Sequence, residues 1–420
     1  MQQEQQLAQK APHEVQDVTE TTCCIVGAGP AGVILALLLA RQDIPVLLLE
    51  AHADFDREFR GDTIHPSSLQ ILDELGLAER LLQFPHGEVH QISGQAGNNT
   101  VTVADFSVLK VKYPYIALIP QTTFLDFVVD EARRYPTFQC IMGAQVDELV
   151  KEDGRVRGVR YRGVDGYHEV RAVLTVGADG RFSRLRKLAG FEPIKSSPPM
   201  DVLWFRLPLK ATDPPQPLGR FLDGKAFVML RRYDHWQIGY VISKGGYQQI
   251  RAAGLDALKS TITKSAPLME DRVDELKTWQ QISVLSVESS YVPRWYLPGL
   301  LLIGDAAHVM SPVAGTGINY AIQDAVVAAN VLAGKLRYGV VETRDLAKVQ
   351  SQRALPTKAI QALQAFLQRQ LLAPMLQGKK APQANPIARA LMRSRLTRYL
   401  AARLVAVGFR QVHVQSNPSL

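Results

Sequence analysis

The chain has 420 residues, of which 46% are hydrophobic and 21% are charged, a composition that argues against a disordered protein. The net charge of +8 is uneven, because residues 351–420 hold eleven Lys or Arg and no Asp or Glu, which leaves −3 for residues 1–350. Since no mixed basic and aromatic patch occurs outside that basic tail, we do not expect nucleic acid as a partner.

The first 20 residues are polar and rich in Gln, and they lack a basic segment followed by an apolar one. We therefore predict a flexible segment over 1–20, no secretory signal and a cytoplasmic protein. Two apolar runs follow, Thr22–Val26 and Pro45–Glu50, each with the length of a buried strand. A glycine-rich turn and a helical stretch that reaches Arg41 lie between them. This βαβ unit predicts that a parallel sheet begins here.

Three cysteines occur in the chain. Cys23 and Cys24 are adjacent in the first predicted strand, so we interpret them as buried side chains and not as disulfide partners. Cys140 stands alone. No group of His and Cys residues has the spacing of metal ligands, and no metal site is predicted.

The helical period continues at Ser67–Leu77 and Phe124–Arg134. Two β-prone runs, Val146–Val150 and Val156–Tyr161, flank the tetrapeptide EDGR and predict a hairpin. Leu174–Ala178 has the pattern of another buried strand, and it leads into Asp-Gly.

The pattern changes between about Pro198 and Ser290. Alternating segments such as VLWFRLPL, AFVMLRRY and HWQIGYVI are separated by turn residues and predict an antiparallel sheet, with a helix at Leu255–Ala266. A buried strand returns at Leu300–Ile303, and an Ala-rich helix extends from it to Leu336. The first and third regions therefore resemble one sheet domain that a second domain interrupts.

The first chemical motif is GAGPAG, from Gly27 to Gly32, between a strand and a helix. Its first glycine permits the tight turn, its second lets the backbone approach a pyrophosphate, and its third lets helix and strand pack closely. Glu50, at the end of the next strand, is placed to accept hydrogen bonds from ribose hydroxyls. This unit predicts dinucleotide binding without distinguishing NAD from FAD.

A second motif, GADGRFSRLR, runs from Gly177 to Arg186 and contains a good helix N-cap, Ser183. Taken alone, it is an ordinary turn from strand to helix. The third motif starts with GDAAH at Gly304 and continues through Pro312 and the Gly-Thr-Gly of residues 315–317. Asp305 is placed to hold a ribityl hydroxyl, and the helix that begins near Ile318 aims its positive end at reduced flavin.

These three motifs, in this order, resemble those of the flavoprotein aromatic hydroxylases, whose type is para-hydroxybenzoate hydroxylase. The likeness covers residues 22 to about 340. It implies roles for Arg60, in FRGDTIHP, at the FAD pyrophosphate, for Gln121, in IPQTTF, on FAD, and for Asp179 and Arg186. One departure is Thr316, where the family usually has glutamine. The predicted cofactor-binding residues are Gly27, Gly29, Ala31, Gly32, Glu50, Ala51, Arg60, Gln121, Val146, Asp179, Gly180, Arg186, Gly304, Asp305, Pro312, Gly315, Gly317, Ile318 and Asn319.

The resemblance and the pattern together predict an α/β protein. A discontinuous Rossmann-like FAD-binding domain is expected over 21–197 plus 291–355, with part of 85–120 reaching the substrate side. An antiparallel-sheet substrate domain is inserted at 198–290, and basic helices follow at 356–420. The likeness implies that NADPH or NADH reduces FAD transiently. It also implies that a C4a-hydroperoxide of the flavin, formed with O2, hydroxylates an aromatic or polyketide/quinone-like small molecule.

Because the flavin is the reactive group, no protein residue is predicted to be a certain catalyst. Pro312 would help to wall the pocket over the flavin, and the inner face of the inserted sheet should supply the other contacts. Its candidates are Trp204, Arg206, Tyr233, His235 and Tyr240. Each of them could instead be an ordinary residue of the sheet.

Three alternatives remain open at this point. A flavin-dependent reductase of a lipophilic, isoprenoid-like substrate could use the same fold and would need no oxygen. A flavin halogenase is disfavoured, because its WxWxIP motif is absent from the sequence. A non-enzymatic scaffold is disfavoured by the intact motifs.

The segment Ile387–Val414 alternates Arg with apolar residues, which predicts an amphipathic helix that packs on the body or makes weak contact with a membrane surface.

Overall fold

The structure is a computed structural model that describes residues 14–56, 62–96, 99–214, 218–222, 224–376 and 394–415. Its largest sheet has the order β19-β20-β11-β1-β2-β8, and the strands from β20 to β8 run parallel. A hairpin of β9 and β10 pairs with β11, as the sequence predicted. The strands of this sheet are β1 (Val15–Val26), β2 (Val46–Glu50), β8 (Phe138–Met142), β9 (Gln145–Glu152), β10 (Arg155–Arg162), β11 (Tyr167–Gly177), β19 (Tyr296–Leu297) and β20 (Leu300–Leu302).

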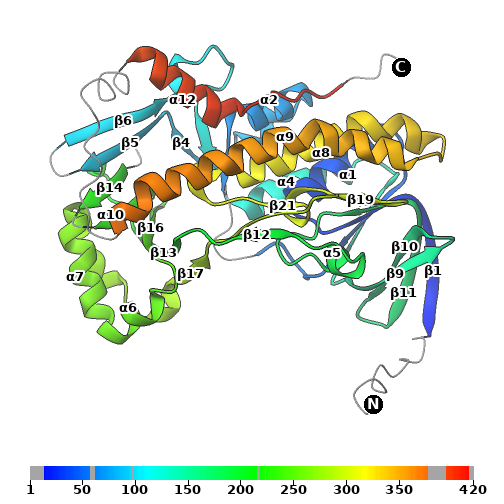
Figure 1. Ribbon diagram of the computed structural model, residues 1–420, viewed down its shortest axis with the longest axis horizontal. Coiled ribbons are helices and arrows are strands. Elements are labelled where there is room, and N and C mark those ends of the chain that lie inside the picture. The colour runs from blue at the N-terminus through cyan, green and yellow to red at the C-terminus, as the bar shows by residue number, and fades with distance from the viewer. Residues whose placement is uncertain are drawn as a thin grey trace.

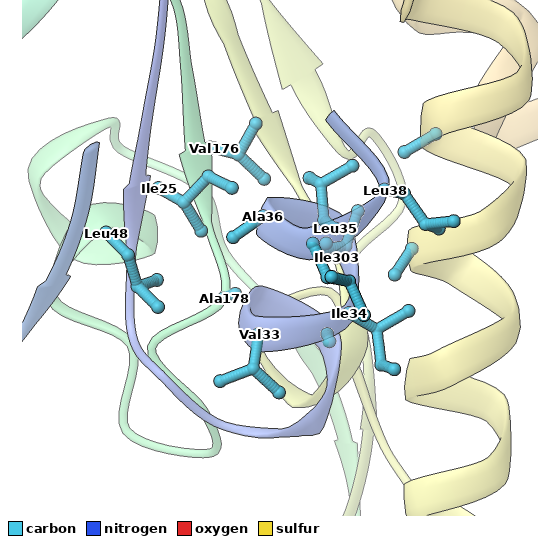
Figure 2. Close-up of a cluster of buried hydrophobic side chains, with 14 of the residues drawn as sticks. Ile25, Val33, Ile34, Leu35, Ala36, Leu38, Leu48, Val176, Ala178 and Ile303 are labelled. Atoms are coloured by element: carbon cyan, nitrogen blue, oxygen red, sulfur yellow. The ribbon is translucent and has the colours of Figure 1, made fainter. Parts of the chain in front are cut away.

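Helix α1 (Pro30–Ala40) lies at the centre of this domain, and every residue from Ala31 to Ala40 is buried. A helix that is apolar all round must be covered on several sides. The sheet covers one side, where Ile25, Leu48 and Val176 face the helix, and α8 (Gly317–Arg337) packs along another (Figure 2). Helix α4 (Gln121–Ala132) also packs on α1.

The second sheet has the order β17-β13-β16-β15-β14-β5-β6. All its pairs are antiparallel except β14 with β5, so residues before 198 extend the predicted substrate sheet. One face packs on α7 (Leu255–Ser265) through a core that includes Phe205, Phe227 and Ile262. The strands are β5 (Gln91–Ala96), β6 (Asn99–Asp105), β13 (Met200–Pro208), β14 (Leu218–Leu222), β15 (Lys225–Arg231), β16 (His235–Ser243) and β17 (Ser283–Ser286).

Two small sheets join these domains. The first has the order β3-β7-β4 and the second the order β12-β18-β21. Their strands are β3 (Thr63–Ile64), β4 (Gly87–Val89), β7 (Ile116–Leu118), β12 (Ile194–Ser196), β18 (Ser289–Tyr291) and β21 (His308–Val309). The shorter helices are α2 (Pro66–Glu74), α3 (Ala78–Leu81), α5 (Arg184–Leu188) and α6 (Tyr247–Ala253).

A long helical rod crosses from the first domain to the second (Figure 1). It consists of α9 (Thr343–Leu367), a π-helical turn η7 (Gln368–Leu372) and α10 (Ala373–Leu376), and α10 contacts β15 and β16. A single rod thus connects the large, mainly parallel sheet to the second sheet.

The predicted helix over Ile387–Val414 is wrong in its extent. Helix α12 covers Arg395–Val407, and residues 408–415 are not helical; residues 387–393 lie outside the described part. The chain after α12 is tied to the body, because Asn330 Nδ2 donates to the His413 carbonyl (2.8 Å) and Val414 N–H donates to Glu74 (2.8 Å). Within the described ranges, no helix is both long and apolar enough to cross a bilayer.

Candidate cofactor and substrate site

The turn after β1 is built on three glycines with different surroundings. Gly27 has φ +101°, which disfavours any residue with a Cβ. A Cβ on Gly32 would collide with the Gly27 carbonyl oxygen, whereas a Cβ on Gly29 would meet nothing closer than 4.0 Å. Gly27 and Gly32 therefore bring strand and helix together, and Gly29 leaves open space in front of the backbone.

The N-terminus of α1 faces that open space. Gly29 is the N-cap without a side-chain cap, Pro30 has no N–H, and no acidic residue stands in the first turn. The backbone N–H groups of Ala31 and Gly32 are thus not used within the helix. Such a terminus suits a phosphate group, because the N–H dipoles converge on negative charge.

Glu50 ends β2 beside this turn and is 3% exposed. Its carboxylate accepts from the Ala28 N–H (2.8 Å) and from the His52 N–H (3.1 Å), and the His52 ring nitrogen Nδ1 lies 2.8 Å from Oε1. These bonds fix the orientation of the carboxylate at the edge of the glycine turn, which is where a ribose would lie beside a bound pyrophosphate. Ala51, the next residue, is exposed.

The Asp-Gly motif and the GDAA motif are joined by Arg186. Its guanidinium donates to the carbonyls of Ala306 (3.0 Å) and Arg181 (2.7 Å). Asp179 accepts from the N–H of Leu185 (3.0 Å) and caps α5, and Ser183 accepts from the Arg186 N–H (3.0 Å), as predicted for an N-cap. Burial raises the pKa of Asp179 above its ordinary value, against those hydrogen bonds. Asp179 and Arg186 therefore hold the turn that Gly180 and Asp305 adjoin.

A fully buried ion cluster lies behind Gly304. Asp324 of α8 contacts His308 Nε2 (2.6 Å) and Arg353 Nε (2.6 Å), and it accepts from the Gly304 N–H (3.0 Å). These three side chains are at most 2% exposed. Burial raises the pKa of Asp324, but the charges of His308 and Arg353 outweigh it and hold the pKa below its usual range. His308 thus has a structural partner, and the cluster fixes the GDAA turn onto α8.

The loop from Pro312 to Thr316 leads into α8. Ala314 and Gly315 both have positive φ, +64° and +61°. A Cβ on Gly317 would meet nothing within 4 Å, so the backbone at the start of α8 borders open space. Thr316 is the N-cap and makes no side-chain cap bond, which leaves the N–H groups of the first turn, including Ile318, without helical partners.

Asn319 has another role than the one its position suggested. Its Oδ1 accepts from the His65 N–H (2.8 Å) and the Ser68 hydroxyl (2.7 Å), while its Nδ2 donates to the carbonyls of Thr63 (3.0 Å) and Gly315 (3.1 Å). An amide side chain has two donors and two acceptor lone pairs, so all four are used. The Asn319 side chain therefore clamps β3 to the loop, and it has no capacity left for the side-chain bond to the cofactor that its place among the predicted cofactor-binding residues would require.

The second sheet presents two different faces to its surroundings. The pairing register places Trp204 opposite Gly239 and Leu203 opposite Tyr240. Tyr240 stacks on Phe227 (4.5 Å between ring centroids) within the core on α7. Adjacent residues of a strand point to opposite faces, so Tyr240 is not on the face of Trp204 and Arg206, and this part of the prediction is wrong.

The face that carries Trp204 is turned toward the loop. Val202 and Val241 pack there with Val313, the residue after Pro312, and with Leu372. A Cβ on Gly239 would lie 2.8 Å from the six-membered ring of Trp204, so this ring rests on the backbone where a side chain would otherwise stand. The result is a half-buried indole on the sheet face against which Val313 also packs.

Two further polar residues lie at the end of this face. Arg206 is exposed, and His235 is half-buried and bonded to Asp234 (2.6 Å); burial lowers the pKa of His235. Tyr233 is 68% exposed at the hairpin turn. A surface hollow of about 500 Å³ beside Trp279 lies on the α6–α7 side of the sheet.

A buried ion pair that no sequence motif indicated connects the two domains. Arg232 donates through Nη2 to Asp62 (2.7 Å) and through Nε to Gln237 (2.7 Å). Burial raises the pKa of Asp62, against the nearby charge of Arg232. Asp62 lies two residues after Arg60, and Arg232 lies directly before Tyr233. Their closeness in sequence to these two predicted site residues was the one indication that the sequence offered for the pair.

Two more predicted residues, Gln121 and Val146, lie elsewhere around the domain. Gln121 is the first residue of α4, half-buried, and Val146 is buried in β9. Arg60 lies outside the described residues.

An extended dinucleotide with a flat ring, such as FAD, fits the features that the described residues provide. These features are the open backbone at Gly29 and Gly317, the carboxylates of Glu50 and Asp305, and the uncapped starts of α1 and α8.

The chain resembles several known proteins. Residues 20–361 match the family described as FAD binding domain. The chain is 34% identical over 410 residues to 6-methylpretetramide 4-monooxygenase of Streptomyces rimosus, covering 97% of each chain. It is 28% identical over 338 residues to digeranylgeranylglycerophospholipid reductase 1 of Methanopyrus kandleri, covering 76% of this chain and 81% of that one. It also shares the fold of p-nitrophenol 4-monooxygenase of Pseudomonas putida, with a TM-score of 0.75, 19% identity and coverage of 94% and 100%.

Proposed function

Because this chain belongs to the FAD binding domain family and is an FAD-dependent monooxygenase, we propose that it hydroxylates an aromatic ring of a polycyclic polyketide. NAD(P)H is the electron donor and O2 the oxidant. The relative that supports this substrate class, 6-methylpretetramide 4-monooxygenase, aligns over 97% of this chain. The predicted inserted domain and the C-terminal helices are thus both included in the likeness.

The observation that carries the proposal is the surface that Trp204 forms over Gly239 beside the Pro312 loop. An indole offers a broad apolar plane against which fused aromatic rings can stack. Along β13, Arg206 follows Trp204 on the same face, at roughly 7 Å from the rise of about 3.3 Å per residue. A cation there suits the phenol or enol oxygens of a polyketide.

FAD, when bound, supplies hydride acceptance and oxygen activation, which no amino acid side chain can perform. The residues of this chain bind and orient it. We assign the N–H groups of Ala31 and Gly32 to the pyrophosphate, Glu50 to a ribose and Asp305 to the ribityl chain. The backbone of Gly315 and Gly317 is assigned to the ring. Val313, Val202 and Leu372 exclude water from the space beside that loop.

The first prediction concerns the purified protein. It is expected to be yellow or to become so with FAD, and to lose visible absorbance on anaerobic titration with NADPH or NADH. Addition of 1,8-dihydroxyanthraquinone, a fused-ring phenol, should accelerate this reduction by at least about tenfold if binding favours the productive geometry. Under ¹⁸O2, the hydroxylated product should carry one labelled atom, which mass spectrometry detects.

A protein that cannot be reconstituted with FAD would overturn the proposal. The likeness to digeranylgeranylglycerophospholipid reductase 1 favours one alternative, a reductase of a lipophilic substrate. If this chain were such a reductase, it would oxidise NAD(P)H without consuming oxygen, and its product would carry no ¹⁸O label. Oxygen uptake per NAD(P)H oxidised therefore separates the two functions.

We also propose weak contact between α12 and an anionic membrane surface, which would present a lipophilic substrate. Leu396, Tyr399 and Leu400 form one outward stripe of α12, and they are 66%, 37% and 53% exposed. Spacings of three and four residues place them on one helix face. Arg395 and Arg403 flank the stripe and are exposed, so it combines apolar and basic groups.

The prediction is that the protein co-sediments with vesicles of phosphatidylcholine and phosphatidylglycerol, more strongly as the anionic share rises. The double variant Leu396→Ser/Leu400→Ser should lower the bound fraction severalfold, because each leucine removed takes away about 1.5–3 kcal/mol of apolar burial at most. Val164→Ser, at a residue that is 99% exposed on the other domain, is the control. Sedimentation that is indifferent to anionic lipid would rule the contact out.

A further inference from the structure

The loop from Ser311 to Thr316 is held from behind by one residue of the long rod. Gln364 is 3% exposed, and its Nε2 lies within hydrogen-bond distance of the Ser311 carbonyl (3.1 Å), the Val313 carbonyl (2.9 Å) and the Thr316 hydroxyl (3.1 Å). The two carbonyls can only accept, so the amide nitrogen must face the loop. Gln364 thus fixes the loop at both ends.

Gln368, one turn further along the rod, bonds to the Ser311 hydroxyl. The rod changes there from an α-helix to the π-helical turn η7. Four residues of an α-helix rotate by slightly more than one full turn, whereas four residues of the wider π-helix rotate by slightly less. The step from Gln364 to Gln368 and the step from Gln368 to Leu372 therefore compensate for each other, and all three side chains stay on one side of the rod. On that side, Leu372 packs on the sheet face that carries Val202.

The loop needs such support because its backbone is costly. Ala314 has φ +64° although it carries a Cβ, and a residue other than glycine keeps this left-handed conformation only where surrounding contacts enforce it. Thr316, where the resembled family usually has glutamine, has a short side chain, and its hydroxyl is the atom that Gln364 reaches. The family match ends at residue 361, just before Gln364.

We infer that Gln364 and Gln368 are positioning residues that set the loop from Ser311 to Thr316 against the flavin ring and couple it to the substrate sheet. The inference rests on the proposed function, since it concerns the loop assigned to FAD. Both glutamines act on the far side of the loop and do so through its carbonyl and hydroxyl groups. The backbone of Gly315 and Gly317 is thereby held ready for the ring.

The test uses Gln364→Met, which keeps the length of the side chain and removes its donors. Gln361→Met is the matched control, because Gln361 lies on the same helix and donates to the carbonyls of Ser290 (2.9 Å) and Val309 (2.9 Å), outside the loop. Both variants lose two bonds to backbone carbonyls, and both should lower the melting temperature. Only Gln364→Met should raise the Kd for FAD, by about tenfold, in a flavin fluorescence titration.

Gln364→Met should also raise the hydrogen peroxide released per NADPH severalfold with 1,8-dihydroxyanthraquinone present. If Gln364→Met fails to fold, Gln368→Met is measured in its place, with an expected smaller rise in Kd of about threefold. Equal FAD affinity in the loop variant and the Gln361→Met control would overturn the inference while leaving the proposed function intact. A wild-type protein that binds no FAD would instead overturn the proposed function.

Discussion

Asp324→Ala is expected to lower the free energy of unfolding by about 3–5 kcal/mol, among the largest effects of any single substitution in this chain. The change leaves the His308 ring and the Arg353 guanidinium without their carboxylate, in surroundings where neither is more than 2% exposed. A buried charge that loses its partner keeps its full desolvation cost. The Gly304 N–H loses its acceptor as well.

Urea unfolding followed by circular dichroism measures this effect. The control is Asp130→Ala, since Asp130 forms an exposed ion pair with Arg133 (2.8 Å) on α4. Exposed pairs contribute roughly 0–1 kcal/mol, so the control should remain close to the wild type. Comparable losses in the two variants would show that the cluster behind Gly304 is not what holds the turn.

The same cluster predicts a dependence of stability on pH. The folded pKa of Asp324 lies below its ordinary value, which is about 3.9 in an unfolded chain. Its contribution is therefore present above that unfolded value and is lost as the pH falls through the folded pKa. Asp324→Ala should flatten the decline of stability below about pH 4, whereas an unchanged decline would place the acid sensitivity in other carboxylates.

Gly32→Ala is expected to prevent α1 from docking on β1. Its Cβ would lie 2.0 Å from the Gly27 carbonyl oxygen, which belongs to the backbone and cannot move aside as the end of a side chain could. Because overpacking a core costs about 1–3 kcal/mol even where side chains can adjust, we expect at least about 3 kcal/mol. The Kd for FAD should then rise by about 100-fold or more.

Gly334→Ala provides the matched control for this substitution. Gly334 also lies within a helix, α8, but a Cβ there would meet nothing within 4 Å. Alanine in an exposed helix interior is more stable than glycine by roughly 0.5–1 kcal/mol. The melting temperature should thus rise slightly for Gly334→Ala and fall steeply for Gly32→Ala. FAD affinity retained in Gly32→Ala would mean that the turn tolerates a wider separation of strand and helix.

The sequence by itself determined the features that short-range geometry governs. The tight turn at Gly27, the buried carboxylate at Glu50 and the N-cap at Ser183 depend on neighbours within a few residues or on the adjacent strand. The β9–β10 hairpin is equally local. Together with the order of the motifs, these features predicted the α/β fold and a dinucleotide site. The monooxygenase class came from the resemblance of the three motifs to the flavoprotein aromatic hydroxylases.

Only the tertiary structure decided which side of an element meets which partner. The alternation of residues along a strand predicts two faces but not which face is covered. Because α7 packs on one face, Tyr240 lies in the core there, while Trp204 lies on the opposite face, against which Val313 packs. Three of the four hydrogen bonds of the Asn319 side chain are likewise made with residues about 250 positions away in sequence, namely Thr63, His65 and Ser68. Each side chain has a limited number of hydrogen-bond donors and acceptors, and the way distant segments pack determines which partners take them. No local pattern in the chain contains that information.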